Sequence, residues 1–187
     1  MSQDDNQSRI IIDSQMSFTE AIDGTKAPDH VIRELCLVDV LYYSFDGKLH
    51  QGQLIVHQSV RQEIEEIFTL MRSERFPIAR AIPIVRYGWS DNASMAANNT
   101  SAFNYRRVAG TRRLSRHATG HAIDINPVQN PVIYQSGRIS PKDAVYQPGA
   151  AGTFSEDSAV VRAFIDRGWC WGGHFRTMMD HHHFQKP

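Results

Sequence analysis

The sequence is poor in cysteine, with two in 187 residues, Cys36 and Cys170. Two cysteines are too few for the disulfide framework of a small secreted scaffold. Cys36 lies in an apolar run and Cys170 lies between two tryptophans, so we expect two buried free thiols. Neither cysteine has a neighbour at the spacing of a zinc knuckle.

Net charge is also lacking, because 20 lysines and arginines balance 20 aspartates and glutamates. A nucleic-acid-binding domain usually carries a strongly basic face, so the balance argues against a nucleic-acid partner. One local cluster is basic. Two interpretations of it stay open, an anionic substrate or a solvated loop. Its members are Arg106, Arg107, Arg112, Arg113 and Arg116.

No apolar run approaches the length of about 20 residues that spans a bilayer, so we expect no membrane partner. Residues 1–19 begin with acidic and amide side chains and lack the apolar core of a secretory signal. We therefore expect a cytoplasmic location for the chain as written, or export by a route that the sequence does not show.

The composition is that of a globular protein, with 41% hydrophobic and 21% charged residues. We expect residues 1–28 to form a polar N-terminal arm, in which the apolar island at 10–12 could add one strand. Residues 29–187 are expected to form a single domain.

Strand-forming residues dominate 35–45 and 49–57, and the turn Asp46-Gly47-Lys48 between them predicts a hairpin. Residues 59–75 follow with the spacing of an amphipathic helix, and Ser59 is the expected N-cap. The apolar stripe of that helix contains Ile64, Ile67, Phe68 and Met71.

The second half predicts shorter elements. We expect a strand at 81–87, a helical turn around 94–97 in a polar loop, and a long excursion at 136–154 near the mouth of a site.

A helix is expected at 155–167, with Ser155 as its cap and Gly168 as its stop. Strands are expected at 169–175 and 181–185. Strands and helices without βαβ alternation favour an α+β fold, a single domain with an antiparallel sheet and flanking helices. The expected buried side of the helix contains Val160, Val161, Phe164 and Ile165.

Two segments carry metal-binding chemistry. In residues 115–127, Gly120 places His117 in a turn, and the next residues alternate as a short strand that directs Asp124 away from its apolar face. A second cluster, residues 180–183, reads Asp-His-His-His. Two ligands from the first segment and one from the second leave a fourth position open, as in a catalytic zinc site.

Specific motifs resemble a known family. The pattern S-x-H-x-x-G-x-A-x-D at 115–124 resembles that of the LAS-type zinc metallopeptidases, the D-alanyl-D-alanine carboxypeptidases and L-alanyl-D-glutamate endopeptidases. W-G-G at 171–173 followed by D-x-x-H-F-Q at 180–185 is similar to the second motif of that family. Residues 98–106 are similar to its substrate-arginine segment. The resemblance covers residues 80–185 and implies a hedgehog/DD-peptidase-like fold.

The resemblance also implies a role for each site residue. It places one zinc ion on His117, Asp124 and His183, Asp180 as general base and acid, and Arg106 on the substrate carbonyl or carboxylate. A planar guanidinium matches a carboxylate in a two-point fork.

Several alternatives stay open. Asp124 could orient a ring nitrogen of His117 instead of binding the metal. His181 is the alternative third ligand, and His181 or His182 could stabilise the transition state. Arg107 could face the site in place of Arg106. Manganese or iron could replace zinc in such a site.

Three further residues are expected to contact substrate: Ser115, Ser101 and Trp171. Core packing is the other interpretation of Trp171. His174 stands where relatives are expected to carry an acidic or polar residue, which leaves substrate preference open.

The resemblance thus implies a zinc-dependent peptidase that hydrolyses a peptidoglycan peptide or a dipeptide containing D-amino acids, most similar to a D-alanyl-D-alanine carboxypeptidase. An L-alanyl-D-glutamate endopeptidase, or lysin, is the nearest alternative. A non-catalytic zinc-fold binding module, as in the hedgehog signalling domain, is the alternative from another class. A nuclease-like use of the arginine cluster is disfavoured by the neutral charge.

Overall fold

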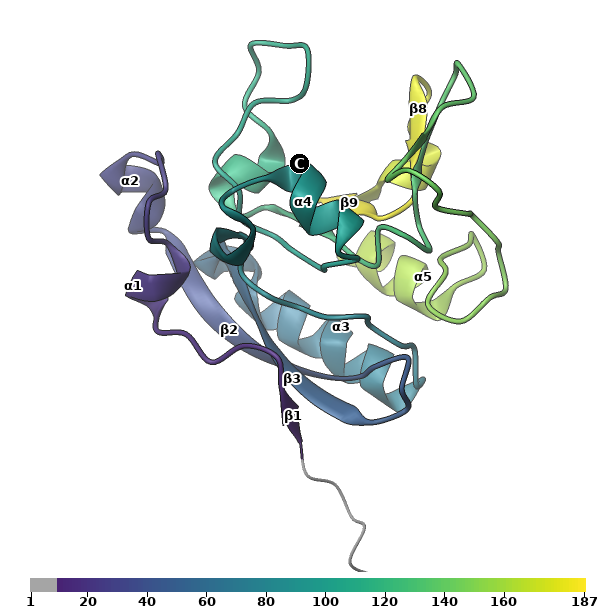
Figure 1. Ribbon diagram of the computed structural model, residues 1–187, viewed down its shortest axis with the longest axis horizontal. Coiled ribbons are helices and arrows are strands. Elements are labelled where there is room, and N and C mark those ends of the chain that lie inside the picture. The colour runs from purple at the N-terminus through teal and green to yellow at the C-terminus, as the bar shows by residue number, and fades with distance from the viewer. Residues whose placement is uncertain (1–9) are drawn as a thin grey trace, which may run out of the picture.

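The computed structural model describes residues 10–187, and its N-terminal half is organised by one hairpin (Figure 1). Strands β2 (Leu35–Tyr43) and β3 (Leu49–His57) pair along their full lengths, from Leu35 opposite His57 to Tyr43 opposite Leu49. The predicted hairpin is confirmed. Gly47 in its turn has a φ of +76°, which glycine adopts without steric cost.

Helix α3 (Arg61–Ser73) lies along this hairpin (Figure 1). The four predicted stripe residues are all buried in the core, because they recur at helical spacing on the face toward the sheet. The predicted cap was wrong. Ser59 lies in a 3-10 turn, η1 (Gln58–Val60), and its backbone N–H donates to His57 Nδ1, so the α-helix begins only at Arg61.

The apolar island at 10–12 forms the strand that the sequence suggested, β1 (Ile11–Ile12), which pairs parallel with β3. Two short helices follow, α1 (Phe18–Ala21) and α2 (Asp29–Ile32). Phe18 and Val31 from these helices pack against buried Leu35 and Ile55 in a second apolar cluster. A domain boundary at residue 28 stays a prediction, and residues 1–9 of the expected arm lie outside the described part of the chain.

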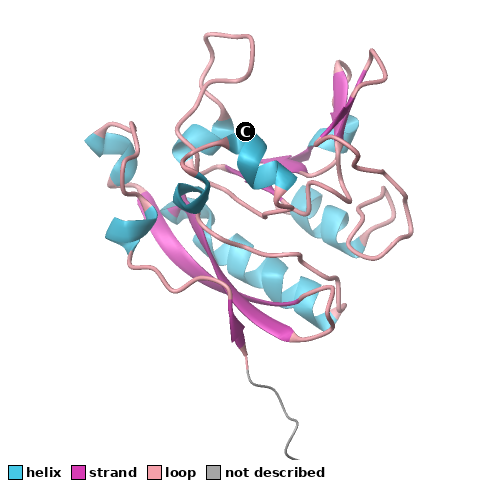
Figure 2. Ribbon diagram, viewed as in Figure 1, coloured by secondary structure: helices cyan, strands magenta, loops and turns pink. Residues whose placement is uncertain are grey.

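The C-terminal half is built from two small antiparallel sheets joined by long loops (Figure 2). One sheet has the order β4-β9-β7 and the other has the order β6-β5-β8. The α+β class is confirmed, but the expected single antiparallel sheet is replaced by three three-stranded sheets, one with a parallel edge. The strands are β4 (Ala122–Asp124), β5 (Val132–Tyr134), β6 (Ile139–Ser140), β7 (Cys170–Trp171), β8 (Met178–Asp180) and β9 (His183–Gln185).

Three predicted strands were wrong or too long. At 81–87, only Ala81 makes an isolated bridge, and Pro83, which has no N–H to pair, leads into the 3-10 helix η2 (Ile84–Tyr87). The segment 169–175 forms β7 and then the 3-10 helix η4 (Gly172–His174). In the third segment, β9 begins only at His183 because the two residues before it form a turn.

Helices in this half also differ from expectation. The polar loop contains α4 (Asp91–Ala96), slightly before the predicted turn. Helix α5 (Ala159–Asp166) starts after Ser158 rather than at the predicted cap Ser155, and Gly168 follows it with a φ of +79°. Ile165, expected to be buried, is 40% exposed. No helix among residues 10–187 has the length and apolarity needed to cross a bilayer.

Aromatic packing joins the two halves in one core. Phe76, which follows α3, stacks on Phe154 with ring centroids 4.9 Å apart, and Phe154 meets Phe184 of β9 edge-on at 5.1 Å. Both cysteines are free, as expected, but the expectation that they are buried was wrong. Cys36 is half-buried and Cys170 is exposed, because its strand turns the neighbouring Trp171 into the core instead.

Gly120 is a sharp test of this packing. Its φ is +72°, and a Cβ there would lie 2.4 Å from the backbone nitrogen of His57. We expect Gly120→Ala to lower the free energy of unfolding by more than about 2 kcal/mol, because strain and overlap with backbone add. Gly137→Ala is the matched control, since its φ is +79° but nothing lies within 4 Å. Equal losses in denaturant titrations would show that the close approach is unimportant.

Candidate metal centre

Three buried side chains from separate elements meet at one point. His117 lies in the 3-10 helix η3 (Arg116–Thr119), Asp124 ends β4, and His183 begins β9. Strands β4 and β9 are antiparallel, and their register sets Asp124 directly opposite His183. Gly120 ends η3 in the left-handed conformation, which turns the chain from His117 into β4.

The donor atoms of this cluster have the spacing of metal ligands. His117 Nε2 lies 3.1 Å from Asp124 Oδ2 and 3.2 Å from His183 Nδ1. His183 Nδ1 lies 2.9 Å from Asp124 Oδ1. Ligands at 2.0–2.1 Å around a tetrahedral zinc ion are separated by about 3.3 Å. The three residues therefore form a group that could hold a metal ion.

The hydrogen bonds on the outer side of each ring set which nitrogen faces the cluster. His117 Nδ1 faces the carbonyl of Ala102, and His183 Nε2 lies 3.1 Å from Gln185 Oε1. These oxygens only accept, so the outer nitrogens carry the hydrogens and the neutral rings present lone pairs to each other and to Asp124. Converging lone pairs repel unless a cation or a proton lies among them, so the donor set fits a metal ion.

The charges of the cluster shift two pKa values. Burial raises the pKa of Asp124, but the charges of His117 and His182 and the hydrogen bonds from His117 and His183 outweigh it and hold the pKa well below its usual range. Burial lowers the pKa of His183, but its hydrogen bond to Asp124 and the charges of Asp124 and Asp180 outweigh burial and raise the pKa to about 9. Without metal, the proton on His183 thus takes the place of a cation.

Asp180 ends β8, three residues before His183. Its Oδ1 lies 3.0 Å from His182 Nε2, but the contact lacks the alignment of a hydrogen bond, and this buried oxygen has no hydrogen-bond partner. His182 is itself fixed, since its Nδ1 donates to the carbonyl of Asn130 at 2.8 Å. The predicted base therefore has a free acceptor atom beside a rigid ring.

His181 lies outside the three-residue cluster. Its ring stacks on Tyr146 with centroids 3.6 Å apart, and its carbonyl accepts the indole N–H of Trp171. Burial and the charge of His182 lower the pKa of His181 to about 4, so the ring is neutral. His181 lies in the turn before β9 and not in the strand expected at 181–185.

The two candidate arginines differ in their surroundings. Arg106 is half-buried, and its Nη2 lies 3.0 Å from Asp91 Oδ2 at the start of α4. Arg107 is exposed and contacts the backbone carbonyl of Arg112 within a small hairpin, where it pairs with Leu114. The burial favours Arg106 over Arg107, and its contact with substrate stays a prediction.

The other predicted site residues also make contacts within the fold. Ser115 Oγ accepts the backbone N–H of His117, and Ser101 pairs with Asp124 through two backbone hydrogen bonds. Trp171 is 3% exposed and belongs to the core. The contacts of Ser115 and Ser101 position His117 and Asp124, and the substrate contacts of all three residues stay predictions.

Sequence reasoning missed the residues that support the cluster through their backbone. The carbonyls of Ala102 and Asn130 orient His117 and His182, and no side-chain pattern marks them.

Asn126 was also missed. It adopts a φ of +48° and its side chain bonds to backbone at Pro77, Ala79 and Gly152. The Asn-Pro pair at 126–127 was a usable signal, because asparagine tolerates this conformation.

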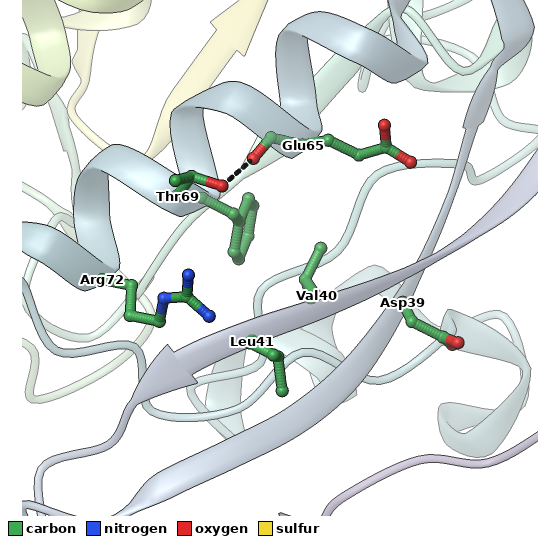
Figure 3. Close-up of a pocket in the computed structure, with 7 residues that line it drawn as sticks. Asp39, Val40, Leu41, Glu65, Thr69 and Arg72 are labelled. Atoms are coloured by element: carbon green, nitrogen blue, oxygen red, sulfur yellow. Dashed lines mark hydrogen bonds between the residues drawn. The ribbon is translucent and has the colours of Figure 1, made fainter.

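A surface pocket between β2 and α3 is separate from this cluster (Figure 3). Its polar groups bond within the fold. The Thr69 hydroxyl donates to the carbonyl of Glu65, and Asp39 accepts from Gln53. Among residues 10–187, the group of side chains that could hold a metal ion is His117, Asp124 and His183, and none of these lines the pocket.

Comparison with known proteins agrees with this assignment. Residues 109–186 match the model of a family described as D-alanyl-D-alanine carboxypeptidase, and the match includes all three cluster residues and Asp180. No curated protein and no solved structure gives a significant match to the chain. The family match confirms the resemblance found in the motifs at 115–124 and 171–185.

The raised pKa of His183 predicts that metal binding releases a proton. At pH 7.5 the metal-free ring is protonated, because its pKa is about 9, and a metal ion bound through Nδ1 must displace that proton. We expect about one proton per zinc ion from this ring, measured by calorimetry in buffers of different ionisation enthalpy. The release should diminish above pH 9. Heats that do not depend on the buffer at pH 7.5 would contradict the assignment.

Proposed function

We propose that the chain, a member of the D-alanyl-D-alanine carboxypeptidase family through residues 109–186, is a zinc-dependent peptidase that acts on peptides of the peptidoglycan type. One observation carries the proposal. The segment that matches the family folds so that two imidazole nitrogens and a carboxylate oxygen converge, and Asp180 leads into the same turn with an unpaired oxygen.

His117 Nε2, Asp124 and His183 Nδ1 are the atoms that would hold the zinc ion. When bound, zinc supplies an acidified water and polarises the scissile carbonyl. The protein holds its ligands ready for this task, since hydrogen bonds to Ala102 and Gln185 fix both rings. Three protein ligands leave a position open for substrate chemistry.

Asp180 moves the proton in this mechanism. Its Oδ1 accepts a proton from the attacking water and then delivers it to the leaving amine, the standard role of a positioned carboxylate. The anchored ring of His182 limits the freedom of this carboxylate on one side. Arg106 donates to the carbonyl or carboxylate of the substrate, for which its planar fork is suited.

A cut that releases a terminal D-alanine is the proposed reaction, because the matching family carries that description. The decisive experiment digests purified peptidoglycan and soluble muropeptides with and without a chelator, and identifies the products by mass spectrometry. We expect loss of terminal D-Ala that stops when metal is removed. A cut after L-Ala would make the protein an endopeptidase, and full metal occupancy without any cut would indicate a binding module.

Asp180→Ala separates metal binding from catalysis. We expect zinc to remain bound stoichiometrically, because the three ligands are untouched, and hydrolysis to fall by about 10²–10⁴-fold through loss of the general base. Metal content by mass spectrometry and initial rates check the two parts. Asp157→Ala, at an exposed position, is the control and should keep full activity. Hydrolysis at the normal rate by Asp180→Ala would remove Asp180 from the mechanism.

A further inference from the structure

The buried polar atoms without a partner lie on two segments, one bonded to His117 through the backbone of Asn104 and one that precedes His183 in the chain. Among residues 10–187 they are Asn104 Nδ2, Arg106 Nε, Asp180 Oδ1 and both ring nitrogens of His181. Buried polar groups elsewhere in the fold are well satisfied. Asn99, for example, makes bonds to both Ile82 backbone atoms and to Ser94. An unpaired buried donor is costly, so each one calls for an explanation such as a ligand.

Asn104 is the clearest case. The residue is only 4% exposed, and none of the roles described above uses its side chain. Its backbone N–H donates to the carbonyl of His117 at 3.1 Å. Two residues earlier, the carbonyl of Ala102 accepts the ring hydrogen of the same histidine. The segment that carries Asn104 therefore lies directly against a metal ligand.

The same segment directs Asn104 and Arg106 to a common side. Phe103 donates its N–H to Ile55 while Asn104 donates to His117, so successive N–H groups point in opposite directions, as in an extended chain. Phe103 and Tyr105 pack in the second apolar cluster. Alternation then places Asn104 and Arg106 on the opposite side of the segment.

One guanidinium nitrogen of Arg106 is paired and another is not. Asp91 holds Nη2 at 3.0 Å, while the buried Nε has no acceptor. Two unpaired N–H donors lie two residues apart on a segment bonded to His117, and they match one group with several lone pairs and negative charge. A carboxylate has that chemistry.

We propose that Asn104 is a substrate-binding residue that donates through Nδ2, together with Arg106 Nε, to the terminal carboxylate of the peptide substrate. This assignment rests on the proposed function. Asn104 thereby joins the site, and the segment 104–106 binds the carboxyl end of the substrate. Asn104 acts on the bound substrate and not on the metal.

Asn104→Leu tests the proposal, because leucine has nearly the same shape and removes the donor. In zinc-loaded protein carrying Asp180→Ala to block hydrolysis, we expect calorimetry to show about tenfold weaker binding of an N-acylated peptide ending in D-Ala-D-Ala. For the C-terminal amide of that peptide, the parent and the Asn104→Leu variant should show almost equal affinities, since the amide lacks the carboxylate that Asn104 is proposed to bind. The melting temperature should stay the same or rise, because an unpaired amide leaves the interior.

Asn99→Leu is the matched control, since that amide is fully bonded within the fold and its loss should lower the melting temperature. The proposal is overturned if Asn104→Leu binds the acid peptide normally, or if it melts as early as Asn99→Leu. If the protein without substitutions hydrolyses other bonds and the Asp180→Ala parent binds neither peptide, the proposed substrate is overturned, and the assignment of Asn104 with it. A parent that binds the acid peptide while Asn104→Leu is unaffected removes Asn104 alone.

Discussion

The pairing of β4 with β9 is the interaction on which the rest of the site depends. It sets Asp124 against His183, residues 59 positions apart in the chain, with Oδ1 and Nδ1 2.9 Å from each other. On its other side, Asp124 exchanges two backbone hydrogen bonds with Ser101, which fixes the segment that reaches Asn104 and Arg106. Behind the pair, Phe184 packs against Phe154 and Phe164. Because Asp124 and His183 extend from a packed sheet, their spacing is set by backbone geometry rather than by flexible side chains.

Folding of this sheet brings the lone pairs of His117, Asp124 and His183 together at one buried point, which is energetically unfavourable unless a positive charge lies among them. A buried carboxylate is unfavourable unless it is paired. In the metal-free protein, histidine charges compensate Asp124, and the raised pKa of His183 is the result. A divalent cation compensates the same carboxylate without requiring a protonated ring. A proton and a metal ion would therefore compete for one position, and the proposed metal binding would depend on pH.

Much of this arrangement was predictable where it depends on local sequence. The hairpin 35–57 and the buried face of α3 follow from short-range periodicity and one turn, and both were predicted correctly. The three clustered residues were named from the family resemblance, because the sequence alone left the choice between His181 and His183 open. One failure had a local cause, since a strand was expected at 81–87 but Pro83 interrupts it, and only Ala81 finds a partner, Thr100. Other features depend on contacts between distant segments. The contacts of His181 with Tyr146 and of His182 with Asn130 join loops whose approach no local pattern indicates.

The buried polar atoms without hydrogen-bond partners indicate how a substrate would lie in the site. Donors are left unpaired at residues 104 and 106, on the segment bonded to His117, and an acceptor is left unpaired at Asp180, on the strand that leads to His183. The segment 104–106 therefore offers donors and Asp180 offers an acceptor, although the sequence as a whole has no net charge. A peptide near its carboxyl end has the matching polarity, since its carboxylate accepts hydrogen bonds and its attacking water and leaving amine exchange protons with a base. The fold leaves these groups without internal partners, and a substrate held in that direction would satisfy them.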